Sequence, residues 1–176
     1  MRDPIGELLA RWRVRVILPH IRARLLDVGC GLNYLVRRYG NGVGLDVYPW
    51  GDVDVLASDA ASLPFRDASF DTVAIIAALN HIPHRSRALC EARRVLRPGG
   101  RLILTMIPPG ISRFWHFLRR PWDADQRERG MAEGERYGLT QAEVRRLLEE
   151  SGFSIQIERR FMLGINRLTI AEKPVQ

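Results

Sequence analysis

A chain of 176 residues with a formal net charge of +7 has the length of one globular domain. Its 46% hydrophobic residues supply a core, which excludes wholesale disorder, and its longest stretch without Asp, Glu, Lys or Arg, residues 72–84, is too short to cross a bilayer. Charged residues occupy the N-terminus, where a secretory signal needs an apolar run. We therefore expect a single cytoplasmic domain over residues 1–176, without a membrane span.

The positive charge leaves the partner open. Of the 27 basic residues only Lys173 is a lysine, and the arginines occur in ones and twos rather than in a tract. Basic side chains release counterions from phosphate, so an RNA partner is one interpretation and an acidic substrate is another. The two cysteines, Cys30 and Cys90, are too few for a disulfide framework and lack the spacing of a metal site, so no metal is predicted.

Helices and strands alternate along the first two thirds of the chain. Residues 5–18 carry apolar side chains at helical spacing and predict an N-terminal helix within residues 1–23. Five apolar runs predict strands: residues 24–29, 42–47, 53–59, 70–78 and 101–107. Two helices are expected between them, at residues 32–39 and 86–96, the second with Pro83 in its first turn and a stop at residues 98–100.

The C-terminal third begins with an irregular stretch, residues 108–138, which mixes proline, glycine, aromatic and charged residues. Thr140 and Glu143 then form a capping box ahead of a helix that stops at Gly152, and two strands joined at Gly164 close the chain. This order predicts an α/β fold with a doubly wound, mostly parallel seven-stranded sheet, helices on both faces and a C-terminal antiparallel hairpin.

The segment LLDVGCGLN, residues 25–33, turns a strand into a glycine loop. Gly29 and Gly31 let the backbone bend and approach a ligand closely. Asp46 ends the second predicted strand, where a carboxylate can accept hydrogen bonds from both ribose hydroxyls of an adenosine. Asp59 ends the third, where it can accept a hydrogen bond from an adenine amino group. Ligands of such sheets bind outside the carboxyl ends of the strands, so the site is expected at the loops after Asp27, Asp46, Asp59 and Ile76.

Four motifs in this order resemble class I S-adenosylmethionine-dependent methyltransferases, and are most similar to the small-molecule (type 11) branch: LLDVGCGLN, VGLDV, SDAASLPFRDASFDTV and LNHIPHRSRALCEARRVLRPGGRLILT. The resemblance covers about residues 24–107 and implies S-adenosylmethionine as the cofactor. The residues that it implies for the cofactor are Asp27, Gly29, Cys30 and Gly31 at the methionine part, Asp46 at the ribose, Val47, Asp59 and Ala60 at the adenine, and Ile76 and Ala77 at the methionine end. Asn33 departs from the family pattern, because many members have a third glycine there.

Methyl transfer asks the protein to position an acceptor and to control its proton. His81 lies five residues beyond Ile76 and is a candidate base, with a packing role as the alternative. Residues 108–138 are the expected substrate lid, and four residues in or near the predicted acceptor site are candidate substrate contacts: His84, Trp115, His116 and Tyr137.

The function expected from these residues is methyl transfer to a small molecule, such as a lipid- or sugar-linked metabolite. An RNA methyltransferase or RNA-binding relative is one alternative, although no RNA-recognition module accompanies the domain. A nicotinamide-dependent oxidoreductase on a related sheet is another, although it does not account for Asp59 or the terminal hairpin. A catalytically silent domain that retains only the fold is the third alternative.

Overall fold

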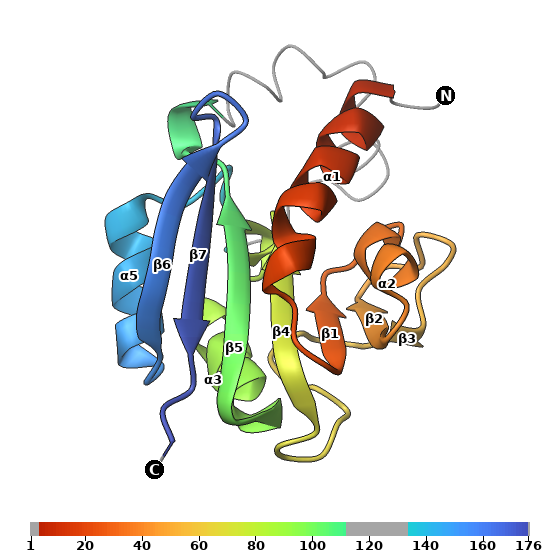
Figure 1. Ribbon diagram of the computed structural model, residues 1–176, viewed down its shortest axis with the longest axis vertical. Helices are drawn as coiled ribbons and strands as arrows, with labels where there is room; N and C mark the ends of the chain where they lie inside the picture. The colour runs from red at the N-terminus through yellow and green to blue at the C-terminus, as the bar shows by residue number, and fades with distance from the viewer. Residues whose placement is uncertain (1–3, 112–133, 176) are drawn as a thin grey trace.

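A computed structural model of the chain describes residues 4–111 and 134–175 and shows one seven-stranded sheet in the order β3-β2-β1-β4-β5-β7-β6 (Figure 1). The strands are β1 (Leu25–Val28), β2 (Gly42–Asp46), β3 (Val55–Leu56), β4 (Phe70–Ile76), β5 (Leu96–Met106), β6 (Ser154–Phe161) and β7 (Asn166–Glu172). Strands β1 to β5 pair in parallel, whereas β7 runs antiparallel to both β5 and β6. The predicted sheet and its C-terminal hairpin are confirmed.

The strand order reverses between β1 and β4. From β1 the chain steps outward to β2 and β3, then returns to the other side of β1 and continues through β4 and β5. The connections after β1 and β4 therefore diverge at the carboxyl edge of the sheet, which is where doubly wound folds open a ligand crevice.

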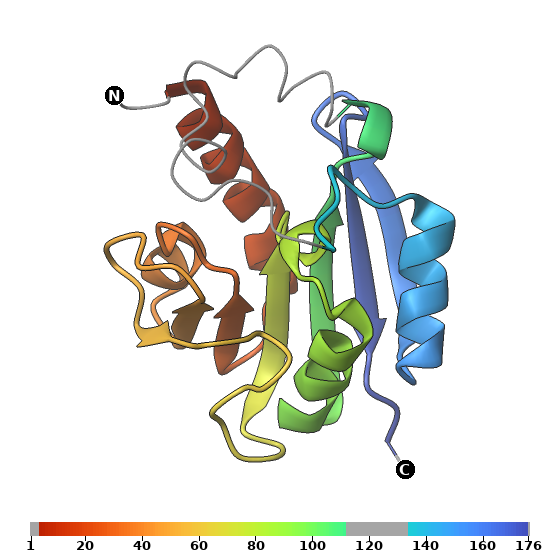
Figure 2. The ribbon, with the colours of Figure 1, turned by 180° about the vertical axis from the view of Figure 1, so that it is seen from behind.

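Helices cover both faces of this sheet (Figures 1 and 2). On one face lie α1 (Pro4–Ile17) and α2 (Tyr34–Tyr39), and on the other α3 (Arg85–Val95) and α5 (Gln141–Glu150). The consecutive residues Leu25 and Leu26 of β1 are both fully buried but belong to opposite cores, because successive side chains of a strand point to opposite faces. None of the helices in residues 4–111 and 134–175 has the length and apolar character needed to cross a membrane.

The boundaries of several elements differ from those predicted. Helix α2 begins at Tyr34 rather than at residue 32, because Asn33 adopts a left-handed conformation with φ of 56°. Helix α3 begins at Arg85, and Pro83 precedes it instead of lying in its first turn. Strand β5 begins at Leu96, so residues 98–100 lie within its span, where Gly99 and Gly100 exchange hydrogen bonds with Lys173. The capping box of Thr140 and Glu143 at the start of α5 is confirmed.

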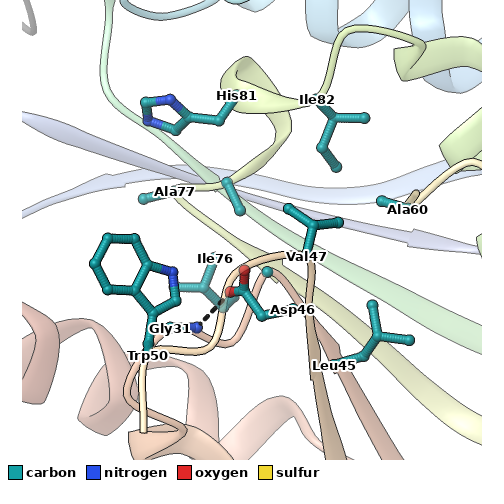
Figure 3. A pocket seen from close by; sticks show the side chains of 12 residues that line it. Gly31, Leu45, Asp46, Val47, Trp50, Ala60, Ile76, Ala77, His81 and Ile82 are labelled. Atoms are coloured by element: carbon teal, nitrogen blue, oxygen red, sulfur yellow. Dashed lines mark hydrogen bonds between the residues drawn. The ribbon is translucent and has the colours of Figure 1, made fainter. Parts of the chain in front are cut away.

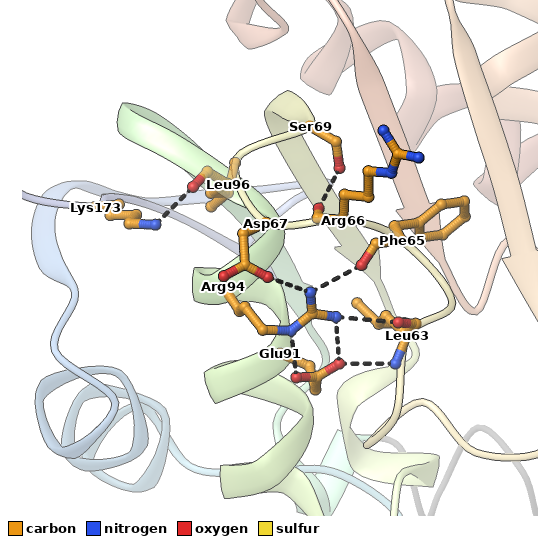
Figure 4. Close-up of polar contacts among 9 residues, drawn as sticks. All are labelled: Leu63, Phe65, Arg66, Asp67, Ser69, Glu91, Arg94, Leu96 and Lys173. Carbon is orange, nitrogen blue, oxygen red and sulfur yellow. Dashed lines mark hydrogen bonds and ion pairs between the residues drawn. The ribbon is translucent and has the colours of Figure 1, made fainter.

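The motif LPFRD, residues 63–67, forms a polar network with α3 that Figure 4 shows in detail. Arg94 donates to both oxygens of Glu91, to the Asp67 carboxylate at 2.7 Å and to the carbonyls of Leu63 and Phe65. Glu91 in turn accepts the Leu63 N–H at 2.8 Å. Arginine suits this position because its planar fork carries five N–H donors. The network holds the loop between β3 and β4 against α3, close to one side of the crevice.

Candidate functional site

A cavity of about 250 Å³ opens at the carboxyl edge of the sheet, on the β1–β4 switch point (Figure 3). Its lining comes from the ends of β1, β2 and β4 and from the loops that follow them. The described residues that line it are Gly29, Gly31, Leu45, Asp46, Val47, Trp50, Ala60, Ile76, Ala77, Ala78, His81 and Ile82. The structure therefore brings Gly29, Gly31, Asp46, Val47, Ala60, Ile76, Ala77 and His81 of the predicted residues together around one space.

Asp46 lies at the centre of the cavity, at the end of β2 (Figure 3). Its Oδ2 accepts the Gly31 N–H at 2.8 Å, and its Oδ1 accepts the Tyr48 N–H at 3.0 Å. These bonds fix the carboxylate, while each oxygen keeps a second lone pair for a ligand hydroxyl. Asp46 thus joins the glycine loop to β2 and presents an acceptor to the cavity.

Asp27 lies near Asp46 but is not among the residues that line the cavity. Its side chain is buried, and its Oδ1 accepts no hydrogen bond from the described residues. Burial, with the nearby Asp46 carboxylate as a second cause, raises the pKa of Asp27 to about 7. None of the described lining residues is lysine or arginine, so a positively charged ligand would supply the positive partner that the carboxylates of Asp27 and Asp46 lack.

The glycine loop is held close to both neighbouring strands. Gly29 has φ of +74°, and a Cβ added there would lie 2.6 Å from the Cβ of Ala78, so only glycine fits this approach of β1 to the end of β4. The N–H groups of Gly29 and Cys30 both donate to the Leu45 carbonyl. Cys30 lies outside the cavity lining, and burial raises the pKa of its thiol well above the usual range, so its sulfur is a poor nucleophile.

Asn33 has a structural role that its place in the glycine motif did not predict. Its buried side chain donates from Nδ2 to the Asp52 carbonyl and to the Asp54 carboxylate, each at 2.9 Å. Asp54 also accepts the Gly44 N–H at 2.7 Å. A Cβ on Gly44 would lie 2.1 Å from Asn33 Oδ1, so the asparagine side chain occupies the space that Gly44 leaves.

Val47 and Ala60 lie at the side of the cavity away from Trp50 (Figure 3). Asp59 does not line the cavity, because β3 ends at Leu56 and the Asp59 Oδ1 instead accepts the Ala61 N–H at 2.8 Å. The expectation that Asp59 ends the third strand is wrong. Its carboxylate stabilises the turn that places Ala60, a common use of aspartate in loops.

Trp50 lines the cavity and was missed in the sequence. It follows Asp46 by four residues, and its ring lies against that of Tyr48, with centroids 4.4 Å apart. Two aromatic residues directly after the strand-ending acid were the available signal. Across from Trp50, the chain leaves β4 through Ala77, which has φ of 53° and donates its N–H to the carbonyl and hydroxyl of Thr105. Such left-handed non-glycine residues cluster at functional sites.

His81 projects over the mouth of the cavity from the 3-10 turn Leu79–His81, beyond Ala77 (Figure 3). Its Nδ1 lies 3.4 Å from the Glu135 carboxylate, whose side chain is 2% exposed. The same turn is tied to the chain around Glu135, because the buried Asn80 accepts the Arg136 N–H and donates to the Arg136 carbonyl, both at 2.9 Å. A carboxylate beside one ring nitrogen orients an imidazole in many active sites.

The predicted substrate residues fall in different places. His84 lies at the start of α3, in a separate groove rather than in the cavity of Asp46, and Tyr137 is exposed outside that cavity. Trp115, His116 and most of the predicted lid, residues 108–138, lie outside the described residues. Within residues 4–111 and 134–175, no group of three or more His, Cys, Asp or Glu residues is arranged to hold a metal ion.

Comparison with known proteins supports the sequence motifs. Residues 26–104 match the family described as "Methyltransferase domain". A phthiotriol/phenolphthiotriol dimycocerosates methyltransferase of Mycobacterium ulcerans is 39% identical over 103 residues, 49% of this chain and 38% of that protein. A demethylmenaquinone methyltransferase of Renibacterium salmoninarum is 36% identical over 112 residues, 53% of this chain and 46% of that protein. The chain thus spans less than half the length of these curated relatives.

The fold extends this likeness beyond the matched motifs. A methyltransferase solved in complex with the Trm112 methyltransferase activator of Haloferax volcanii superposes with a TM-score of 0.71, at 18% identity, over 94% of this chain and 90% of that one. At 18% identity the superposition shows that the two chains share a fold. The ordered motifs, the fold and the matches confirm the resemblance to class I S-adenosylmethionine-dependent methyltransferases that the sequence shows.

Proposed function

We propose that this chain transfers the methyl group of S-adenosylmethionine to a small-molecule acceptor of the lipid-linked type. The observation that carries the proposal is the convergence, in one cavity, of the Asp46 carboxylate, the close-packed glycine loop and a histidine at the β4 end. When bound, S-adenosylmethionine supplies a methyl group on a sulfonium, which a nucleophile displaces in line. The protein therefore has to bind, orient and control a proton.

The residues of the cavity fit the cofactor. Asp46 would accept the ribose hydroxyls, and Val47 and Ala60 would pack against the adenine. The orphaned, buried Oδ1 of Asp27 would be compensated by the positive charge of the methionine ammonium. Gly29 lets the loop pack directly against Ala78, where any larger residue would clash, and this close approach shapes the side of the cavity that would receive the methionine part.

The acceptor would enter over His81, Trp50 and Ile82, a largely apolar mouth. This lining favours an apolar or planar acceptor over a free sugar. The curated relatives support the same direction, since their names specify phthiotriol dimycocerosates and demethylmenaquinone as the molecules that those proteins methylate. Among the acceptors expected from the sequence, we therefore favour the lipid-linked class over the sugar-linked class.

His81 is positioned to take a proton from an acceptor at the cavity mouth, with Glu135 orienting its ring. If His81 acts as a base, His81→Gln lowers the turnover number and leaves the affinity for S-adenosylhomocysteine within about twofold. If His81 only packs the turn, thermal stability falls while turnover per folded molecule stays unchanged.

The proposal is tested first by cofactor binding. Isothermal titration with S-adenosylhomocysteine should show binding to the wild-type chain, and Asp46→Ala should weaken it by at least about tenfold, because hydrogen bonds to a charged group are lost. Asp52→Ala is the matched control: Asp52 lies in the loop after the same strand and makes an exposed ion pair with Arg37, so its loss should leave binding unchanged. A preference for NADH over S-adenosylhomocysteine would refute the assignment.

The acceptor class is tested by methylation of fractionated extracts with a labelled cofactor. The label should appear in the lipid fraction. Label confined to RNA, or to water-soluble sugars, would contradict a lipid-linked acceptor while leaving the cofactor assignment intact.

A further inference from the structure

A second groove, of about 340 Å³, lies between the start of α3, residues 136–139 and the middle of α5. Four arginines line it, Arg85, Arg87, Arg136 and Arg146, together with His84 and a single carboxylate, Glu143. Four guanidinium groups against one carboxylate give this groove an excess of positive charge, and unlike the equally basic groove around Glu158 it lies next to the cofactor cavity along the chain.

The single carboxylate does not neutralise the groove. Glu143 is occupied by the capping box, where it accepts the N–H and hydroxyl of Thr140, and by an ion pair with Arg136 at 2.5 Å. Arg146 has only a distant partner, Glu150, at 3.8 Å. Arg87 has no ion-pair partner among residues 4–111 and 134–175.

Arg85 is built into the wall of this groove. Its Nη2 donates to the carbonyls of Asn80 and Gly134, while its buried Nε has no hydrogen-bond partner among the described residues. Burial lowers the pKa of Arg85 and the positive charge of Arg136 lowers it further, while the carboxylates of Glu143 and Glu135 offset part of this effect. The first turn of α3 adds to this field, because it contains no acidic residue and no side-chain cap.

The groove adjoins the cofactor cavity. Ile82 lines the cavity and the next residue, Pro83, lines the groove. The segment that carries Arg136 is fixed to the turn that carries His81 through the two Asn80 hydrogen bonds. An acceptor whose reacting atom lies near His81 can therefore extend a second group into the groove without leaving the protein surface.

We propose that the arginine groove binds a phosphate or diphosphate group of the acceptor. The chemistry fits, because guanidinium forks pair with phosphate oxygens in a bidentate manner, and four arginines less the Glu143 carboxylate leave three positive charges for a diphosphate group. This inference rests on the proposed function for its link to methyl transfer, but anion binding by the groove can be measured by itself.

The test uses inorganic pyrophosphate and inorganic phosphate as probes, by isothermal titration of the intact chain at fixed ionic strength. Pyrophosphate should bind more tightly than phosphate. The double variant Arg87→Gln/Arg146→Gln should lose at least about tenfold in pyrophosphate affinity, because charge-assisted hydrogen bonds are removed. Neither arginine holds the fold, since neither has a close partner.

The matched control is Arg38→Gln, an exposed arginine of α2 far along the chain from the groove. It removes the same charge and should leave pyrophosphate binding unchanged. Equal losses in Arg38→Gln and in the groove variant would overturn the proposal, because the effect would then be one of net charge alone. The affinity for S-adenosylhomocysteine should be the same in all three proteins, so a failure of cofactor binding is distinguishable from a failure of the groove.

The source of the phosphate is resolved by two further arms. Free pyrophosphate should compete with binding of a soluble prenyl diphosphate, and the groove variant should weaken both. Binding only to vesicles that contain phosphatidylglycerol, or only to poly(U), with no measurable pyrophosphate binding, would overturn the proposal in favour of a membrane surface or of RNA.

Discussion

The packing of Asn33 against Gly44 makes Gly44→Ala an informative perturbation of the cofactor loop. The new methyl group would lie 2.1 Å from Asn33 Oδ1 and 2.6 Å from its Cγ, so the asparagine side chain has to leave its position. Asn33 is 1% exposed, and Gly44 itself lies within the ladder that pairs β2 with β1. Movement of the backbone is therefore the more costly response.

The energetic cost follows from the bonds that Asn33 makes. Displacing its side chain breaks one hydrogen bond to the Asp52 carbonyl and one to the Asp54 carboxylate, together about 3 kcal/mol. Replacing glycine by alanine in a strand returns about 0.5 kcal/mol of backbone entropy. We therefore expect Gly44→Ala to lower the free energy of unfolding by about 2–3 kcal/mol.

The partner variant Asn33→Gly completes a double-mutant cycle. It loses the same two hydrogen bonds but relieves a left-handed asparagine, which returns about 1 kcal/mol, so its net cost should be about 2 kcal/mol. With the asparagine side chain gone, the added methyl group meets no clash, and the double variant should be about as stable as Asn33→Gly alone. The coupling energy between the two sites should thus equal the cost of Gly44→Ala in magnitude, about 2–3 kcal/mol.

Urea denaturation followed by circular dichroism measures all four proteins, and titration with S-adenosylhomocysteine reports the cofactor loop in each. Additive losses, with the double variant less stable than either single variant, would refute the steric argument. A stable Gly44→Ala protein with unchanged cofactor affinity would show that the loop is not held through Asn33.

Three further predictions concern charge and capping. Asp27 keeps its proton up to about pH 7 in the folded chain but releases it near pH 3.8 in the unfolded chain, so its contribution to the free energy of unfolding is full below about pH 3.8 and is lost by about pH 7. Asp27→Asn should flatten the dependence of the free energy of unfolding on pH in denaturation curves, and an unchanged slope contradicts the assignment. Arg94→Lys should lower the free energy of unfolding by about 2 kcal/mol, because a lysine cannot reach both Glu91 oxygens and three other acceptors, and a loss below about 0.5 kcal/mol would argue against the network. Thr140→Ala should cost about 1 kcal/mol and raise the pKa of its capping partner from about 2 toward 4.5, which carboxyl NMR titration measures.

The alternation of strands and helices was predictable because each long element has a clear hydrophobic pattern. The buried parallel strands read as continuous apolar runs, and α5 carries both its capping box and its glycine stop. The motif of residues 63–67 was identified by resemblance, and the structure supplies its physical reason in the Arg94 network.

The errors arise where side chains compete with backbone hydrogen bonds. The third strand was expected over residues 53–59 but spans only Val55–Leu56, since Asp54 bonds to Gly44 and Asn33 while Asp59 closes a turn. These side-chain hydrogen bonds leave no periodic pattern in the sequence. Short polar residues serve equally well in caps, turns and ligand sites, so their roles depend on contacts far along the chain.

The cofactor side of the cavity was more predictable than the acceptor side. Gly29, Gly31 and Asp46 occur in a local pattern whose geometry follows from strand and loop. Trp50 lines the same cavity from an irregular loop, and His84, directly before α3, lines the arginine groove. The position of a loop residue in the folded chain cannot be predicted from local sequence spacing.

The attachment of Arg136 to Asn80 has a consequence for how such domains diversify. The chain leaves the sheet at the end of β5 and is fastened again at residue 136, beside His81, by bonds between backbone groups and one asparagine side chain. Because the Arg136 side chain takes no part in these anchors, any substitution of Arg136 other than proline leaves both bonds in place. The side chain at position 136 is thus free to vary, and with it the charge of the arginine groove, while the turn that carries His81 keeps its attachment.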